Sequence, residues 1–373
     1  MNYKTILEQY GQTQYDEYLH RIGDKLQLSE TQKDSVSKSY EALAEYIENN
    51  SELLNDYEEI KVYSQGSYAL STVNRPLRTE KFDIDIVVEF PRTNASLGPQ
   101  RFYNSLVKVF KGESRYREIV ELKNRCVRIN YASSNYYFDI LPVVPTQGEN
   151  IKLAPDKELK DWVRTSPKKY RDWFEIRCKN NLHFRATDMA LEELPKDNLP
   201  FSLKPALKRS VQLIKRARDI YFRDDNKYSP SSIVLTTLFA MYYNGESSTY
   251  QNMKNTVDKI NKQSQNVFTL NNPVDAKEEF TEKWKKDHKY YDSFFDFFEY
   301  MRDKLALLES TEGVHNKIKV LSDLFGESTT HQMLDSMSQW HNDTTYGVNQ
   351  HGRLTTEEYV VPAKKNNFYG SKD

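Results

Sequence analysis

The chain has 373 residues, of which 53 are Lys or Arg and 54 are Asp or Glu, giving a formal net charge of −1. This balance argues against a protein that coats nucleic acid through its overall field, but it does not exclude a local basic cleft. The two cysteines exclude a disulfide framework, and no histidine pairs with a cysteine at zinc-ligand spacing. No stretch approaches the about 18 apolar residues of a membrane span. We therefore expect a cytoplasmic protein without a membrane partner.

The first half of the chain carries both helix and strand signals. Ser29 and Gln32 have the spacing of a capping box, and they open a predicted helix that ends near Asn50. Apolar runs predict strands over 60–63 and 82–90 and a hairpin over 126–131 and 136–144, with a helix over 102–110. This order predicts an α+β fold in which helices flank a small mixed sheet.

From about residue 167 onward the strand signals disappear. Helical spacing predicts helices over 207–221, 233–243, 294–308 and 318–324. The cluster of Pro195, Pro200 and Pro205 indicates a boundary between lobes at residues 185–202. We expect a core domain over 1–190, a helical lobe over 191–340 and an irregular tail over 341–373, with the active site in the cleft between the two lobes.

Three carboxylates in two apolar runs suggest the chemistry. Asp83 and Asp85 are two residues apart in a predicted strand, so they share one face of it, and Asp139 lies in a second such run. Carboxylates this close repel one another, and aiming three of them at one point makes sense only around divalent cations. Hard oxygen ligands suit Mg²⁺ or Mn²⁺. The pattern predicts a two-metal phosphoryl- or nucleotidyl-transfer site, with Asp139 on the side of the attacking hydroxyl.

Gln65, Gly66 and Ser67 follow a predicted strand upstream of these carboxylates. A glycine allows the backbone to approach a phosphate closely, and a serine hydroxyl adds a donor. Taken alone, a Gly-Ser pair is more often a plain turn. Its position ahead of the apolar-flanked carboxylates favours a triphosphate loop.

Basic residues in the second half could reach the same phosphates. Lys215 lies in a predicted helix that precedes Ser231 and Ser232, where the next helix begins. A lysine and a hydroxyl at a helix start could clamp the distal phosphates from the second lobe. The neighbouring cations are predicted to be solvated; these are Lys208, Arg209, Arg216 and Arg218. The aromatic and basic segment 162–174 could meet a nucleic acid, but packing between the lobes is the favoured interpretation.

Several motifs resemble those of the bacterial cGAS/DncV-like nucleotidyltransferases (CD-NTases), relatives of cyclic GMP-AMP synthase and oligoadenylate synthetase in the polymerase-β-like superfamily. The resemblance is most specific from Gln65 to Thr72 and from Phe82 to Asp85. Other matching segments are Arg75 to Leu77, Cys126 to Arg128, Phe138 to Pro142, Ser166 to Phe174, Gln212 to Arg216, Asn272 to Val274 and Phe280 to Trp284.

The resemblance implies an enzyme that joins nucleoside triphosphates, ATP among them, into a cyclic di- or trinucleotide messenger. Such messengers activate a separate effector protein in anti-phage signalling. The resemblance also implies roles for the candidate residues. Asp83, Asp85 and Asp139 would hold Mg²⁺, Gln65, Gly66 and Ser67 would form the triphosphate loop, and Lys215 with Ser231 or Ser232 would grip the phosphates.

The chain departs from the animal DNA sensor because it has no zinc-ribbon cysteine cluster. The DNA-sensing mode of the animal enzyme is therefore not supported, and we expect no constitutive nucleic-acid partner. We also expect a monomer. Two alternatives stay open. One is a transferase of the same fold with another acceptor, such as an RNA-tailing enzyme, and the other is a non-catalytic nucleotide- or RNA-binding regulator. The intact set of three carboxylates argues against the regulator.

Overall fold

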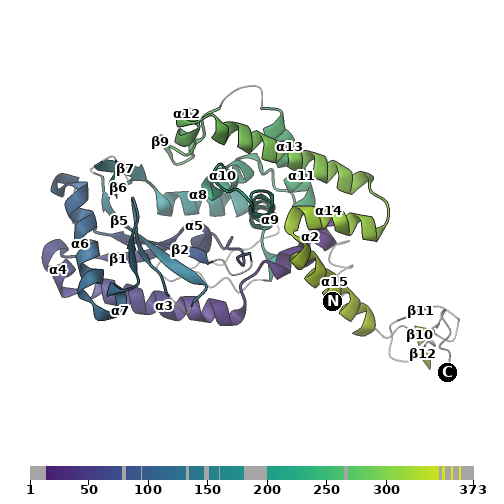
Figure 1. Ribbon diagram of the computed structural model, residues 1–373, viewed down its shortest axis with the longest axis horizontal. Helices are drawn as coiled ribbons and strands as arrows, with labels where there is room; N and C mark the ends of the chain where they lie inside the picture. Colours follow the sequence, from purple (N-terminus) through teal and green to yellow (C-terminus); the bar gives the residue numbers. More distant parts are fainter. Residues whose placement is uncertain are drawn as a thin grey trace.

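The computed structural model describes residues 14–77, 81–93, 95–131, 134–146, 151–158, 160–179, 200–263 and 268–343, and three two-residue strands further on. A core lobe built on a mixed sheet lies beside a helical lobe (Figure 1). The predicted α+β class is confirmed. Among the described helices, none combines the length and the apolar character that a membrane crossing requires.

The sheet has the order β1-β2-β5-β4-β3, and β6 and β7 extend it from β5. Only β2 and β5 run parallel, while the other neighbours are antiparallel. The predicted strands and the 126–144 hairpin are confirmed, but β3, β6 and β7 were not predicted. The strand bounds are β1 Lys61–Gln65, β2 Phe82–Glu89, β3 Val120–Leu122, β4 Val127–Ile129, β5 Tyr136–Pro145, β6 Lys152–Asp156 and β7 Asp161–Thr165.

Helices α3 and α6 cover one face of this sheet. Ser29 caps α3 through the predicted reciprocal capping box with Gln32. The buried side chains of α3 and α6 pack with those of β2, β4 and β5, for example Leu43 and Leu106 with Ile84. The helices of the core lobe are α3 Glu30–Glu48, α4 Ser51–Tyr57, α5 Gly66–Ala69, η1 Ala95–Leu97, α6 Pro99–Gly112, α7 Ser114–Arg117 and α8 Pro167–Lys179.

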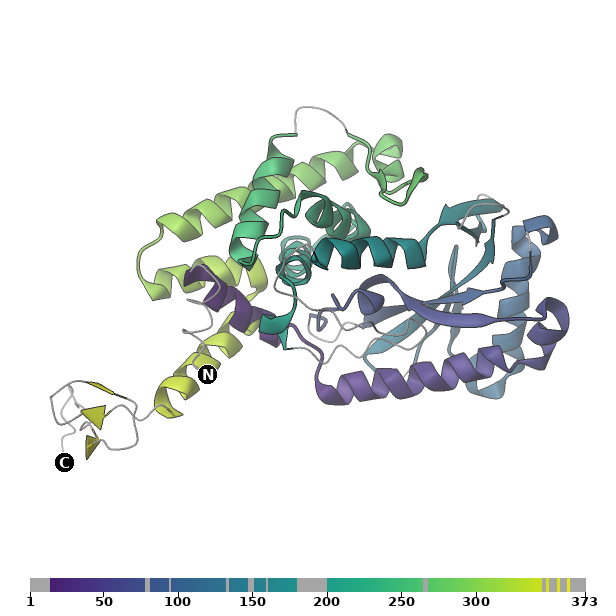
Figure 2. The same ribbon diagram turned by 180° about the vertical axis from the view of Figure 1, so that it is seen from behind.

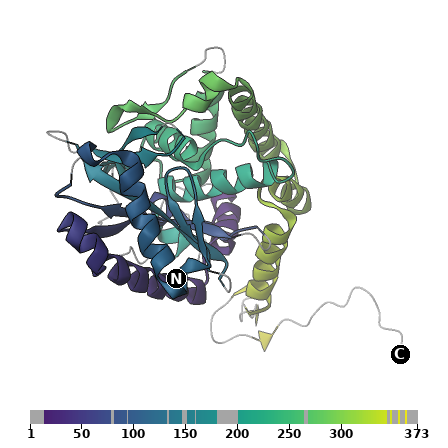
Figure 3. The ribbon, with the colours of Figure 1, turned by 60° about the vertical axis from the view of Figure 1, so that its left-hand side comes forward.

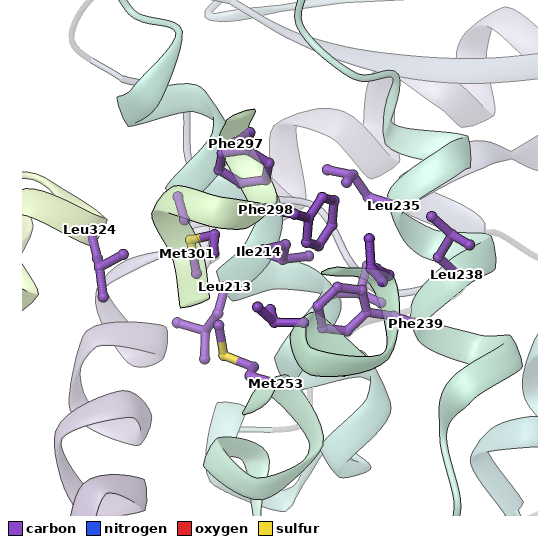
Figure 4. Close-up of a cluster of buried hydrophobic side chains, with 14 of the residues drawn as sticks. Leu213, Ile214, Leu235, Leu238, Phe239, Met253, Phe297, Phe298, Met301 and Leu324 are labelled. Atoms are coloured by element: carbon purple, nitrogen blue, oxygen red, sulfur yellow. The ribbon is translucent and has the colours of Figure 1, made fainter. Parts of the chain in front are cut away.

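The helical lobe has its own core, part of which is shown in Figure 4. Figure 3 shows its helices along the upper and right-hand sides of the core lobe. Its elements are η2 Phe201–Leu203, α9 Ala206–Tyr221, α10 Ser232–Tyr242, α11 Thr249–Asn261, β8 Asn271–Asn272, β9 Asp275–Glu279, α12 Glu282–Lys286, α13 Lys289–Ser310, α14 Val314–Phe325 and α15 Glu327–Asp343. The four helices predicted here are confirmed, whereas the β8–β9 hairpin contradicts the expected loss of strands after residue 167.

Helix α9 is buried on nearly all sides. It packs against α10, α11 and α14, and its Arg209, Lys215 and Arg216 are buried. The prediction of a solvated basic face is wrong for Arg209 and Arg216, because both donate to backbone carbonyls of neighbouring segments. Lys208 instead pairs with Glu175 of α8.

The first helix of the described chain, α2 Gln14–Lys25, joins the helical lobe rather than the sheet (Figure 2). Its Leu19, Ile22 and Leu26 belong to the helical core, as do Tyr170 and Phe174 of α8. The expected domain boundary near residue 190 lies outside the described residues. In the expected tail the structure describes only β10 Gly347–Val348, β11 Leu354–Thr355 and β12 Val361–Pro362.

Candidate active site

Four polar side chains form a row across the sheet. Asp85 of β2 pairs in register with Asp139 of β5 on one side and with Gln65 of β1 on the other. Asp139 in turn pairs with Arg128 of β4. Register-paired residues lie on the same face of a sheet, so the row is fixed by backbone pairing alone. Asp83 lies two residues before Asp85 on that same face.

The other face of the same strands explains why the row is held in place. Ile84, Ile86, Phe138 and Ile140 alternate with the carboxylates and are fully buried in the core lobe. Slipping either strand by one residue would turn these side chains out of the core and bury the carboxylates. The apolar residues that predicted the strands therefore also aim the carboxylates away from α3 and α6.

Asp85 is in an environment that opposes its negative charge. Burial raises its pKa well above the ordinary value of 3.8, and the charges of Asp83 and Asp139 raise it further. Lys215 and Arg128 act in the opposite direction. A carboxylate kept under this repulsion is suited to bind a cation.

Asp139 is paired in a different way. Arg128 donates from Nε to Oδ1 at 2.7 Å and from Nη2 to Oδ2 at 2.9 Å. The guanidinium carbon lies 3.6 Å from the centre of the Tyr137 ring. With both Asp139 oxygens engaged, no three acidic, histidine or cysteine side chains among the described residues are grouped as ligands of one cation. A role for Asp139 as third ligand would require Arg128 to release it.

Gly66 brings the backbone against Asp85. It begins the short helix α5 with φ +62°, in the left-handed region that favours glycine. A Cβ atom placed here would lie 2.1 Å from Oδ2 of Asp85. Only glycine allows the backbone to come this close to Asp85. Ser67 is the next residue of α5 and lines the same cavity as Gly66 and Asp85.

The helical lobe contributes cations. Lys215 is 7% exposed and donates to the carbonyl of Thr72 at 3.0 Å. Burial lowers its pKa to about 8, with a further lowering from Arg218, whereas Asp83 and Asp85 act to raise it. Arg218, which was expected to be solvated, donates to the Ser232 hydroxyl and the Pro230 carbonyl, each at 3.0 Å.

Two cavities meet at Gly66 and Asp85. The smaller, of about 310 Å³, is lined by residues that include Ser67, Asp83, Lys215, Arg218 and Ser232. The larger, of about 660 Å³, is lined by residues that include Gln65, Ser231, Trp162 and Glu278. The structure thus brings the predicted site residues other than Asp139 to one pair of cavities, but it places Ser231 in the larger and Ser232 in the smaller. Asp139 lines neither cavity and is held by Arg128.

The site also contains two residues to which the sequence analysis gave no role, Arg128 and Arg218. The position of Arg128 follows from strand alternation once the hairpin register is known. Arg128 pairs with Asp139, so its side chain lies on the carboxylate face, whereas that of Val127 lies on the other face. Arg218 lies three residues after Lys215 on α9, a spacing that puts both on one side of a helix.

The character of Lys215 can be tested directly. We expect Lys215→Met to weaken nucleoside triphosphate binding by about 10-fold or more, because a charge-assisted contact to phosphate is lost. Since the amine is protonated below its pKa of about 8, wild-type affinity should fall as the pH rises through that value. Titration calorimetry at several pH values measures both effects. An unchanged pH profile in Lys215→Met would exclude Lys215 as the titrating group.

Residues 13–178 match the family described as "Second Messenger Oligonucleotide or Dinucleotide Synthetase domain". A c-di-GMP synthase of Roseivirga ehrenbergii is 26% identical over 378 residues, which cover 98% of this chain and 100% of that protein.

Solved structures show the same fold. The Bradyrhizobium diazoefficiens CD-NTase CdnG in complex with GTP has a TM-score of 0.69 at 19% identity, covering 87% of this chain and 99% of that one. For Escherichia coli CdnC with ATP the TM-score is 0.64 at 14% identity, covering 85% and 99%. For Escherichia coli DncV in its 3′-deoxy GTP bound form it is 0.62 at 17% identity, covering 83% and 94%.

Proposed function

We propose that the chain is one of the cGAS/DncV-like nucleotidyltransferases (CD-NTases) and that it joins two nucleoside triphosphates into a cyclic dinucleotide. The family match over residues 13–178 and the similarity to a c-di-GMP synthase support this proposal. Each of the two phosphodiester bonds forms when a ribose hydroxyl attacks an α-phosphorus and pyrophosphate leaves. The observation that carries this proposal is that Asp85, where the two cavities meet, has Asp83 beside it on the same strand and pairs in register with Asp139.

The donor set fits Mg²⁺, or Mn²⁺ in its place. Asp83 and Asp85, joined by Asp139 once Arg128 releases it, would supply only carboxylate oxygens, the ligands that these cations prefer. The repulsion around Asp85 gives the apo site a need for positive charge. When bound, two such ions supply activation of the hydroxyl and neutralisation of the leaving pyrophosphate.

The remaining roles follow from placement. In the smaller cavity, Gly66 and Ser67 offer close backbone approach and a hydroxyl, and Lys215 and Arg218 offer positive charge. This set suits a triphosphate. The larger cavity, of about 660 Å³, has the volume for a second nucleotide, and Asp85 lines both cavities. We further propose that the product is a second messenger for a separate effector protein, as in anti-phage signalling.

The test is to incubate the full chain with four labelled nucleoside triphosphates and Mg²⁺, and then with phosphatase. We expect a phosphatase-resistant product without added RNA, and no product when EDTA removes the cation. Mass spectrometry then gives the bases and the ring size. A product that needs an RNA acceptor and extends its 3′ end would instead support the tailing enzyme. Binding without any product would support the regulator.

A further inference from the structure

The far wall of the larger cavity is formed by the helical lobe. The cavity extends from Gly66 and Asp85 to the β8–β9 hairpin. Its lining also includes three aromatic residues, Trp162, Tyr170 and Phe280. Aromatic rings stack on the flat faces of nucleobases without selecting among them. Selection therefore requires polar groups at the edge of a bound base.

The hairpin is fixed to the core lobe by an ion pair. Arg164 of β7 donates from Nε to Oδ2 of Asp275 at 2.8 Å and from Nη2 to Oδ1 at 3.1 Å. The Asp275 side chain is only 4% exposed. A desolvated two-bond pair of this kind holds its partners in one geometry. The distance from the carboxylates of β2 to the hairpin is thereby set by the protein.

Glu278 is the hairpin carboxylate that has bonding capacity left. Its Oε2 accepts one hydrogen bond, from Nδ2 of Asn272 at 2.7 Å. Within the described part of the chain, no donor to its Oε1 is found. By contrast, Glu279 accepts from Thr281 and pairs with Lys285. Ser166, also on the cavity wall, is 3% exposed, and its hydroxyl has no partner among the described residues.

We propose, on the basis of the function proposed above, that Glu278 selects guanine for the nucleotide whose base occupies this cavity. Guanine alone among the common bases presents two adjacent donors on its Watson–Crick edge, N1–H and the exocyclic N2 amine. An ionised carboxylate is an acceptor only, and its two oxygens can take both donors. Adenine presents an acceptor, N1, where guanine presents N1–H, so it meets the carboxylate with one mismatched position.

The surroundings of Glu278 make this selection depend on pH. Burial raises the pKa of Glu278 to about 7, and Asp275 of the same hairpin raises it too. Asn272 of β8, Arg125 before β4 and Arg164 of β7 all lower it. Below that pH the group is a neutral acid whose O–H can donate to adenine N1. Above it the carboxylate accepts from guanine, so the preference for guanine should grow as the pH rises through about 7.

Binding of the α,β-methylene analogues of GTP, ITP and ATP to the full chain tests this selection, because these analogues cannot release pyrophosphate. We expect the wild type to bind the GTP analogue about 10-fold or more tighter than the ATP analogue above pH 7. The ITP analogue lacks the N2 amine and should fall between them. Glu278→Gln should bring the GTP-to-ATP ratio close to one and remove its pH dependence.

Glu279→Gln is the matched control, on the same strand but with a carboxylate engaged by Lys285 and Thr281. It should keep the wild-type ratio. An unchanged ratio in Glu278→Gln, or no guanine preference in the wild type, overturns the inference. If Glu278→Gln does not fold, the pH profile of the wild-type ratio decides. If Glu278 governs guanine binding but no cyclic product forms, only the proposed function is contradicted. If cyclic product forms but the GTP-to-ATP binding ratio does not depend on Glu278, only this inference is contradicted.

Discussion

Asp85→Asn is expected to abolish product formation and yet to stabilise the fold. Product yield should fall at least about 1,000-fold, because an amide is a poor ligand for the cations and cannot replace a charged carboxylate. Without cations, the same change removes a charge that burial, Asp83 and Asp139 all disfavour. We expect the free energy of unfolding to rise by about 1 kcal/mol. Thermal unfolding in EDTA measures it.

The pH dependence of the free energy of unfolding independently tests whether Asp85 destabilises the fold. The pKa of Asp85 is raised in the folded protein above its ordinary value of 3.8, so the folded state binds this proton more tightly than the unfolded state. The contribution of Asp85 to stability therefore becomes more favourable as the pH falls through the raised pKa towards 3.8. The stability gain of Asp85→Asn over wild type should shrink over the same range.

Asp83→Asn provides the comparison. Asp83 is exposed, so its replacement should lower product yield without a comparable gain in stability. A destabilised Asp85→Asn protein would contradict the electrostatic account of the site. Normal product yield from Asp85→Asn would contradict the assignment of catalysis to this row.

Backbone pairing explains why the sequence predicted the carboxylates well. Asp83 and Asp85 share a face because strand side chains alternate, and the apolar residues between them fix which face that is. The same alternation holds for Asp139 among Phe138 and Ile140. Local sequence specifies both strands. Because their apolar faces are buried against α3 and α6, the carboxylates must lie on the opposite face of the sheet.

Predictions from the sequence were poor for residues whose environment depends on partners far away in the chain. Apart from Lys215, the cations of α9 were predicted to be solvated, but the carbonyl of Arg75, more than a hundred residues away, accepts from Arg216. Strands β6 and β7 are polar, and Pro155 interrupts the signal, yet they pair with each other and with β5. Arg128 owes its position to the register between β4 and β5. Glu278 owes its position to the pair of Arg164 with Asp275, which fixes its hairpin to the core lobe and which no local pattern contains.

Gly66→Ala should cost both stability and activity, because two separate effects act at this position. The φ of +62° disfavours any residue with a Cβ atom, and that atom would lie 2.1 Å from Oδ2 of Asp85. Strain of the first kind costs about 1–3 kcal/mol. The contact adds to it and displaces Asp85, so we expect product yield to fall by about 100-fold or more. Chemical denaturation and the product assay measure the two losses.

Gly98→Ala separates these effects. Gly98 has a similar φ of +76°, but an added Cβ would meet nothing within 4 Å. It precedes α6 in the core lobe, away from the carboxylate face. Its substitution should therefore show the backbone strain alone, with a loss of stability and an unchanged yield per folded molecule. Equal yields from the two variants would mean that the approach of Gly66 to Asp85 does not matter for the chemistry. A lower yield from Gly66→Ala alone would show that product formation needs the close approach of Gly66 to Asp85.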